Sequence, residues 1–246
     1  MTQAFLDSGA KVGGAAQVIQ DSDFSSPNFL ALPGEISTAE AAAGVAQAVK
    51  ARWGRIDGLI HLIGGFAGGT RVDETDDETL DKMLAVNLRA AFYFIKAVVP
   101  GMRTEGSGRI LAIGSRTAVT PTAGLGVYSV SKAALVSLVQ TVALENKDRG
   151  ITVNVVLPST MDTPANRKAM PAADPARWVA PSQVAALLVH LASDAASNIQ
   201  SPGLERPPSP PTPLGGNVGS GALTLLHQGR GLNQFPVSDT RSQEPE

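Results

Sequence analysis

Along this chain, short apolar runs alternate with longer stretches in which apolar residues recur at helical spacing. The first pattern predicts strands and the second predicts helices. Short apolar runs bounded by glycine, proline or polar residues predict strands at 10–16, 28–32, 56–63, 109–113 and 151–157. Apolar residues at helical spacing predict helices at 38–53, 75–102, 128–149 and 182–193. Regular alternation with short connections indicates βαβ units. We therefore predict an α/β fold with a Rossmann-like, doubly wound, mostly parallel sheet and helices on both faces.

Both ends of the pattern depart from a complete fold of this class. Residues 1–8 resemble the last turns of a helix that stops at Gly9, so we expect the first strand of the sheet to be missing, as after a misassigned start. Beyond 198 the chain is dense in proline, then glycine, then polar residues. We predict a domain at 1–198 that also lacks its last strand. The tail at 199–246 is predicted to be disordered apart from 222–227, as after a frameshift or alternative splicing.

Composition narrows the range of functions. The chain has 246 residues, which suits one α/β domain, and it has no cysteine, so disulfides and thiol chemistry are excluded. Its net charge is −2 with no long basic run, which argues against nucleic-acid and membrane-surface partners. No apolar stretch approaches the roughly 18–20 residues that span a bilayer. We expect a soluble, cytoplasmic protein.

The residues with the clearest chemical potential follow the predicted strand at 109–113. Ser115 lies at the end of that strand, and Tyr128 and Lys132 lie four residues apart on the next helix, where their side chains share one face. A phenol normally titrates near pKa ~10. An ammonium group beside it would lower the pKa of Tyr128, which would make this side chain an acid or base near neutral pH.

Four positions in matching order resemble the active-site pattern of the short-chain dehydrogenases/reductases, over roughly 5–198. They are Asn87 in Leu-Ala-Val-Asn-Leu, Ser115 in Ala-Ile-Gly-Ser, and Tyr128 with Lys132. The resemblance implies hydride transfer between a nicotinamide cofactor, NAD or NADP, and a small carbonyl or alcohol. Tyr128 would exchange a proton with the substrate oxygen, and Ser115 would bind that oxygen. Lys132 would lower the Tyr128 pKa and hold the nicotinamide ribose, and Asn87 would help hold a proton-supplying water.

The same resemblance supplies further cofactor-binding positions besides Tyr128 and Lys132. They are Glu35 and Ile36 near the adenine, Gly64 where the backbone approaches the nucleotide, and Pro158, Met161 and Thr163 beside the nicotinamide. The family's glycine-rich phosphate-binding turn has no counterpart, and Gly13-Gly14 is no substitute because it lies in a strand. The choice between NAD and NADP stays open. His61 stands where the family usually has an asparagine, and core packing is the favoured interpretation over a ligand role.

A narrower resemblance concerns the segment from Leu157 to Trp178, which contains Asp162-Thr163-Pro164 and Asn166-Arg167-Lys168. It is similar to the corresponding segment of dihydropteridine reductases, and a lid over the substrate is the favoured interpretation of it, with an ordinary surface loop as the alternative. The helix at 128–149 is apolar nearly all round, so we expect a homodimer or homotetramer through the helices at 75–102 and 128–149. The alternative function is a non-catalytic, cofactor-deficient homologue that acts as an interaction subunit.

Overall fold

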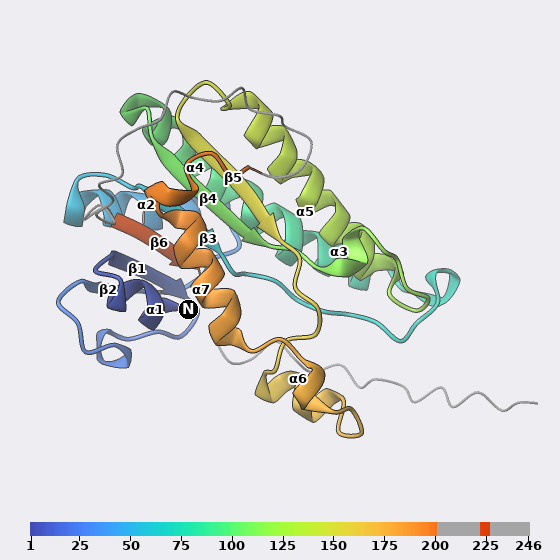
Figure 1. Cartoon of the computed structure of the whole chain (residues 1–246). Helices are drawn as coiled ribbons and strands as arrows, with labels where there is room; N and C mark the ends of the chain where they lie inside the picture. Colours follow the sequence, from blue (N-terminus) through green and yellow to red (C-terminus); the bar gives the residue numbers. More distant parts are fainter. Residues whose placement is uncertain (201–221, 227–246) are drawn as a thin grey trace, which may run out of the picture.

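Six strands form the central sheet of the computed structural model, which describes residues 1–200 and 222–226 (Figure 1). In chain order the strands are β1 (Lys11–Ala16), β2 (Phe29–Pro33), β3 (Gly58–His61), β4 (Gly108–Ile113), β5 (Ile151–Val156) and β6 (Ala222–Leu226). Their order across the sheet is β2-β1-β6-β3-β4-β5, and every neighbouring pair is parallel. The predicted α/β, doubly wound class is confirmed.

The strand β6 lies in the middle of the sheet, although it comes last in the chain. It pairs with β1, where Lys11 stands opposite Ala222, and with β3, where Gly58 stands opposite Leu223. No described strand precedes β1, as expected from the sequence, but the centre of the sheet is filled. The facing edges of β1 and β3 carry backbone N–H and C=O groups that need partners, and β6 supplies them. The predicted disorder of the rest of the tail concerns residues outside those described.

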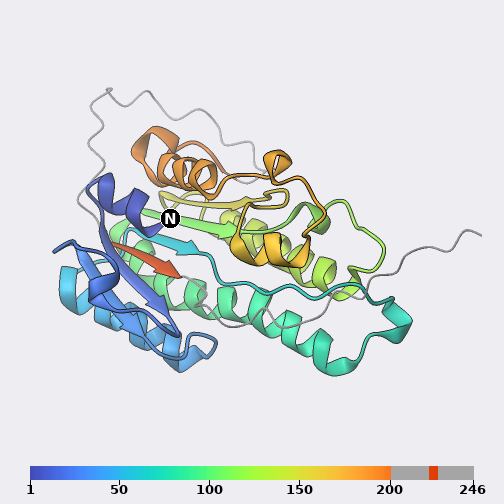
Figure 2. The same cartoon turned by 90° about the horizontal axis from the view of Figure 1, so that it is seen from below.

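Helices cover both faces of the sheet, as Figure 2 shows from below. One face carries α2 (Ala39–Trp53), α4 (Ala90–Glu105) and α5 (Gly126–Glu145), whose buried residues share one core cluster with β3, β4 and β5. The other face carries α1 (Thr2–Asp7) and α7 (Pro181–Ala192), which share a second cluster. The helix α6 (Pro164–Ala169) lies outside both layers (Figure 1). Short 3₁₀ turns lie at 21–23, 72–74, 116–118, 175–177 and 194–196.

The longest helix runs from Asp77 to Glu105 and contains three segments: α3 (Asp77–Leu84), a π-helical turn (Ala85–Arg89) and α4. The sequence predicts the end of this helix at 102, with Pro100-Gly101 as the stop signal, but the helix continues through both residues to Glu105. Val99 and Met102 are buried on either side of Pro100. Their packing outweighs the helix penalty of an internal proline, which is about 3 kcal/mol.

The two longest helices also correct the expectation about apolar stretches. By length and composition alone, Asp77–Glu105 and Gly126–Glu145 are apolar enough to cross a membrane. In this fold both are core helices, because each buries a row of side chains against the sheet. Core helices of globular domains commonly pass such a test, since a helix covered on several sides is apolar on several sides.

Candidate active site

Tyr128 lies in the first turn of α5 and faces the carboxyl end of β4. The loop after β4 contains Ser115, whose hydroxyl hydrogen-bonds the Thr117 hydroxyl at 3.0 Å and accepts from the Thr117 N–H at 3.3 Å. Burial raises the pKa of Tyr128 above its usual 10, and the Ser115 side chain works in the lowering direction. Lys132 is not among the causes of this shift, so its predicted lowering of the Tyr128 pKa stays a prediction.

Lys132 is the most deeply buried cation of the site, with 5% of its surface exposed. Its ammonium group donates to the Ile113 carbonyl at 3.0 Å, the one hydrogen bond of this group among the described residues. Burial lowers the pKa of Lys132 from 10.5 to about 8. The other two ammonium hydrogens have no partner among the described residues. A Cβ at Gly64 would lie 3.0 Å from the Lys132 nitrogen and 3.0 Å from the Asn87 side-chain oxygen, so the glycine lets both polar atoms approach the backbone.

Asn87 lies in the π-helical turn and is fully buried. Its side chain accepts from the Gly65 N–H at 2.9 Å and donates to the Gly65 carbonyl at 3.1 Å. It also donates to the Ser131 hydroxyl at 2.9 Å, and that hydroxyl donates to the Tyr128 carbonyl at 2.8 Å. The Asn87 amide therefore joins the loop after β3 to the backbone of Tyr128. Its water-holding role stays a prediction.

Of the predicted catalytic residues, the structure brings all four to one end of the sheet. Ser115 lies close enough to Tyr128 to influence the pKa of its hydroxyl. Asn87 and Lys132 both lie about 3.0 Å from the position that a Cβ of Gly64 would take. The arrangement combines a half-buried phenol, a hydroxyl beside it and a buried ammonium one helical turn away. It can donate a proton to an oxygen atom and stabilise charge that develops there.

The positions expected near the adenine form a closed local turn. The Glu35 carboxylate accepts from the N–H groups of Ile36 and Ser37 at 2.8 and 2.7 Å and from the Ser37 hydroxyl. These bonds lower the pKa of Glu35, the Ser37 hydroxyl most of all. The Ile36 side chain is buried in the core. In this arrangement Glu35 binds its own turn.

The positions expected beside the nicotinamide lie where β5 leads into α6. The Thr163 hydroxyl caps α6 by accepting from the Asn166 N–H at 3.2 Å, and the Met161 carbonyl accepts from the Asn166 side chain at 2.8 Å. Pro158 lies just beyond the end of β5 and is half-buried. The structure thus assigns capping and turn contacts to these residues, and their cofactor contacts stay predictions.

The nicotinamide side of the site fits the cofactor that the fold implies. Lys132 keeps unused buried donors, which suits the hydroxyls of a ribose, and the lack of a side chain at Gly64 lets the Lys132 and Asn87 side chains approach the backbone there. The phosphate side is different, because the residues that follow β6 lie outside those described. Tyr128, Lys132 and Gly64 are therefore the residues that would hold the nicotinamide ribose.

The segment predicted to be a lid is closed at its base. Met161 pairs with Val179 in an isolated parallel bridge, and the Asp162 N–H donates to the Val179 carbonyl at 2.9 Å. Within the segment, the Arg167 guanidinium makes two bonds to the Asp162 carboxylate at 2.6 and 2.8 Å. This pair lowers the pKa of Asp162. The two ends of the segment, at Met161 and Val179, are therefore adjacent, which is compatible with a loop over a site.

Sequence reasoning missed two side chains at this site. Ser131 precedes Lys132 and lies three residues after Tyr128, so helical spacing alone could have placed it on the inner face. Phe66 contacts the Tyr128 ring edge-to-face, with ring centroids 5.0 Å apart. Phe66 is the one large side chain in the glycine-rich stretch after β3. A large residue among glycines in the sequence could have marked it as a candidate.

His61 lies on β3, among the core side chains rather than at the site. It is 1% exposed, its ring centroid is 6.4 Å from that of Phe94, and neither ring nitrogen has a hydrogen-bond partner among the described residues. Burial, with a smaller effect of the Lys132 charge, lowers the pKa of His61 to about 3. The position of His61 agrees with the core-packing interpretation.

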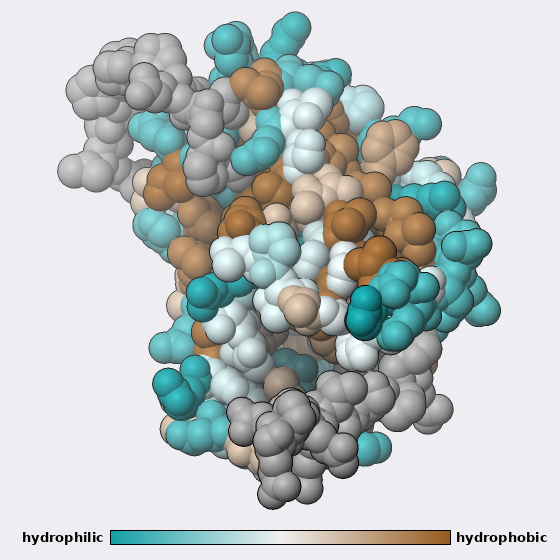
Figure 3. Space-filling model, turned by 90° about the vertical axis from the view of Figure 1, so that its right-hand side faces the viewer, coloured by the Kyte–Doolittle hydropathy of each residue, from teal (hydrophilic) through white to brown (hydrophobic). Residues whose placement is uncertain are grey.

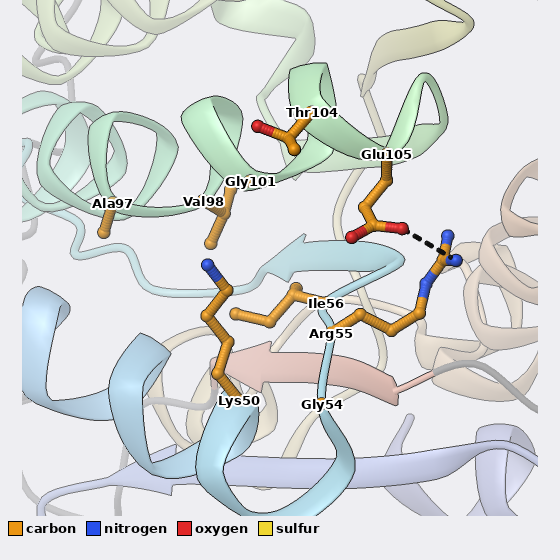
Figure 4. A pocket seen from close by; sticks show the side chains of 9 residues that line it. All are labelled: Lys50, Gly54, Arg55, Ile56, Ala97, Val98, Gly101, Thr104 and Glu105. Carbon is orange, nitrogen blue, oxygen red and sulfur yellow. Dashed lines mark ion pairs between the residues drawn. The ribbon is translucent and has the colours of Figure 1, made fainter.

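A hollow of about 140 Å³ lies between α2 and α4 at the other end of the sheet. The Lys50 ammonium points across it toward α4, and Arg55 forms an ion pair with Glu105 at 3.1 Å (Figure 4). Ile56 precedes β3 and Glu105 precedes β4, so this hollow faces the amino ends of the strands. It is remote from Tyr128, and ligands of doubly wound sheets bind at the carboxyl ends.

Comparisons with known proteins bear on the family and the fold of this chain. A family model described as enoyl-(acyl carrier protein) reductase matches residues 2–202. The 2,3-dihydro-2,3-dihydroxybenzoate dehydrogenase of Escherichia coli is 30% identical over 214 residues, which cover 80% of this chain and 85% of that protein. The 2,5-dichloro-2,5-cyclohexadiene-1,4-diol dehydrogenase LinX of Sphingobium indicum is 40% identical over 114 residues, 46% of this chain and 43% of its own length. A short-chain type dehydrogenase/reductase from Mycobacterium ulcerans has a similar fold, with a TM-score of 0.66 at 22% identity, covering 81% of this chain and 69% of that one.

Proposed function

We propose, for a chain that belongs to the short-chain dehydrogenase/reductase family, that it transfers a hydride between NAD or NADP and a small carbonyl or alcohol, with Tyr128 as the general acid/base. Oxidoreductase activity follows from the family, which generally uses NAD(P)H. The observation that carries the finer proposal is the half-buried Tyr128 side chain, which lies beside Ser115 and one helical turn from the buried Lys132 ammonium.

The side chains divide the chemistry between them. The bound nicotinamide supplies or accepts the hydride. Ser115 holds the substrate oxygen, and the Tyr128 hydroxyl gives that oxygen a proton during reduction. Because burial raises the pKa of Tyr128, the phenol stays protonated at neutral pH, which suits the reducing direction. Lys132 binds the ribose, and Asn87 with Ser131 fixes the backbone that carries Tyr128.

Replacing Tyr128 tests the proposal directly. Tyr128→Phe removes the acidic hydroxyl and keeps the ring, so we expect kcat/KM for carbonyl reduction to fall by about 10²- to 10⁴-fold. The chain has two tyrosines, and Tyr93→Phe is the matched control, expected to keep its activity. Turnover is measured by NADH and NADPH absorbance. Unchanged activity in Tyr128→Phe, with both variants folded, would remove Tyr128 from its role.

The alternative of a non-catalytic homologue predicts a different result. Calorimetric titration of NADH and NADPH into the full chain measures cofactor binding, and Lys132→Met is expected to weaken it because a buried donor to the ribose is lost. No binding of either nucleotide would favour the alternative. We further propose a cytoplasmic enzyme without nucleic-acid or membrane partners, an interpretation supported by the net charge of −2 and the lack of cysteine.

A further inference from the structure

The loop after β3 presents one large side chain among small ones. Its sequence is Gly-Gly-Phe-Ala-Gly-Gly, from 64 to 69. Ala67 is buried, whereas 47% of the Phe66 surface is exposed. A phenylalanine that is half exposed loses part of the hydrophobic stabilisation that burial would give, and it offers that apolar surface to other molecules.

The rest of the protein holds this loop in place. Asn87 binds both backbone groups of Gly65 at 2.9 and 3.1 Å. The Gly69 N–H donates to the Gly124 carbonyl at 2.8 Å. The space over Gly68 is filled by Leu125 and by the Phe66 ring, whose Cζ would lie 3.0 Å from a Cβ there. Bonds on both sides of Phe66 therefore fix its backbone, and packing over Gly68 fixes its ring.

The Phe66 ring contacts the ring of Tyr128. Its centroid lies 5.0 Å from that of Tyr128, and the two planes meet at 65°, an edge-to-face contact. Ser115 lies close enough to the Tyr128 side chain to influence the pKa of its hydroxyl. A substrate oxygen that takes a hydrogen bond from these two hydroxyls lies within about 3 Å of them. The carbon skeleton next to that oxygen then comes within reach of the exposed part of Phe66.

Apolar side chains continue from Phe66 around this part of the surface. Leu125 packs beside it over Gly68, and Val72 packs over Gly126 at the start of α5. The side of the molecule that carries α3 shows such apolar side chains gathered among charged ones (Figure 3). A skeleton placed against Phe66 therefore meets carbon rather than hydrogen-bonding groups along this wall.

We propose that Phe66 is a specificity-determining residue that selects substrates with a planar, aromatic ring next to the reacting carbonyl or alcohol carbon. This inference rests on the proposed function of Tyr128. A planar ring can stack on a fixed phenyl group at little cost in conformational entropy, whereas a flexible chain of the same carbon number must be ordered first.

The test compares two ketones on matched variants of the full chain. Acetophenone and the open-chain methyl ketone of the same carbon number are reduced by the native chain, by Phe66→Ala and by Phe66→Leu. The control is Phe92→Ala, because Phe92 is 46% exposed and makes the same edge-to-face contact, at 65°, with Tyr93. We expect Phe66→Ala to lower the preference for acetophenone about tenfold, Phe66→Leu to lower it less, and the control to keep it. An unchanged preference in Phe66→Ala would overturn the inference.

Two readouts keep the test independent of turnover. If neither the native chain nor any variant reduces either ketone, the proposed function fails. In that case ligand-observed NMR measures acetophenone binding and tests the role of Phe66 by itself. Weaker binding of acetophenone by Phe66→Ala than by Phe92→Ala supports the proposed role of Phe66, and equal binding overturns it. In a Tyr93→Phe background, Tyr128 is the one tyrosine left, and its ultraviolet titration reports its own pKa. Removing the Phe66 ring should hydrate Tyr128 and lower that pKa; no change would show that the ring does not cover it.

Discussion

Burial governs the charge state of two side chains at the centre of the site and of His61 in the core. It raises the pKa of Tyr128, lowers that of Lys132 to about 8, and lowers that of His61 to about 3. All three shifts favour the neutral form, as desolvation demands. The site is therefore built to hold a neutral phenol, and its one buried cation, Lys132, keeps unused donors for a ligand.

His61 makes this cost of burial measurable. Neither of its ring nitrogens has a described partner, so we expect His61→Leu to stabilise the fold by about 1–3 kcal/mol in urea unfolding at pH 7. The folded pKa lies below the unfolded value of 6.5, so the unfolded state binds protons first as pH falls. Stability from this group is thus lost from about pH 6.5 down to about pH 3, and His61→Leu should flatten that loss.

A second histidine provides the control. His190 is exposed on α7, and His190→Leu should change the free energy of unfolding at pH 7 by less than about 0.5 kcal/mol. If His61→Leu destabilises the chain, the imidazole has a partner or fills a space that leucine cannot.

The site was partly predictable from the sequence at the scale of single residues. The spacing of Tyr128 and Lys132 places both on one side of a helix, and resemblance placed Ser115 and Asn87 with them. The direction of the Tyr128 pKa shift could not be predicted, because it depends on burial by segments distant in sequence. The same holds for Phe66, whose position depends on a loop packed against α5.

At the scale of elements, local patterns predicted what local interactions determine. Thr38 caps α2 by accepting from the Ala41 N–H, and Gly54 ends that helix with a φ of 87°. Pro100 misled the prediction because tertiary packing outweighs its local effect. The place of β6 could not be predicted at all, because the exception of 222–227 from the predicted disorder says nothing about which strands this segment joins.

The central place of β6 leads to a prediction about shortened chains. A chain ending at Gln200 loses β6 and leaves β1 and β3 without a shared partner. We expect its urea midpoint to fall, because its free energy of unfolding should drop by several of the roughly 5–15 kcal/mol that stabilise a domain. A chain ending at Leu226 keeps β6 and should unfold like the full chain. Equal midpoints for the chain ending at Gln200 and the full chain would show that the predicted domain at 1–198 is independent of β6.

At the scale of the whole molecule, one surface of α5 is unlike the rest of the exterior. Val130 and Leu144 lie fourteen residues apart, close to four helical turns, and more than half of each side chain is exposed. Ser137 and Thr141 lie between them on the same side and are small. A flat strip of apolar and small residues on a long, rigid helix suits contact with the same strip of a second copy, related by a two-fold axis.

We therefore predict that the chain is a homodimer or homotetramer through α4 and α5. Light scattering after size exclusion should give at least twice the monomer mass of 25.3 kDa. The double variant Val130→Glu with Leu144→Glu should be monomeric, because charges in the centre of an interface lose their hydration without gaining partners. Val18→Glu is the control, since Val18 is an exposed valine outside these helices. A native chain of monomer mass, or a double variant that keeps its mass, would contradict the prediction.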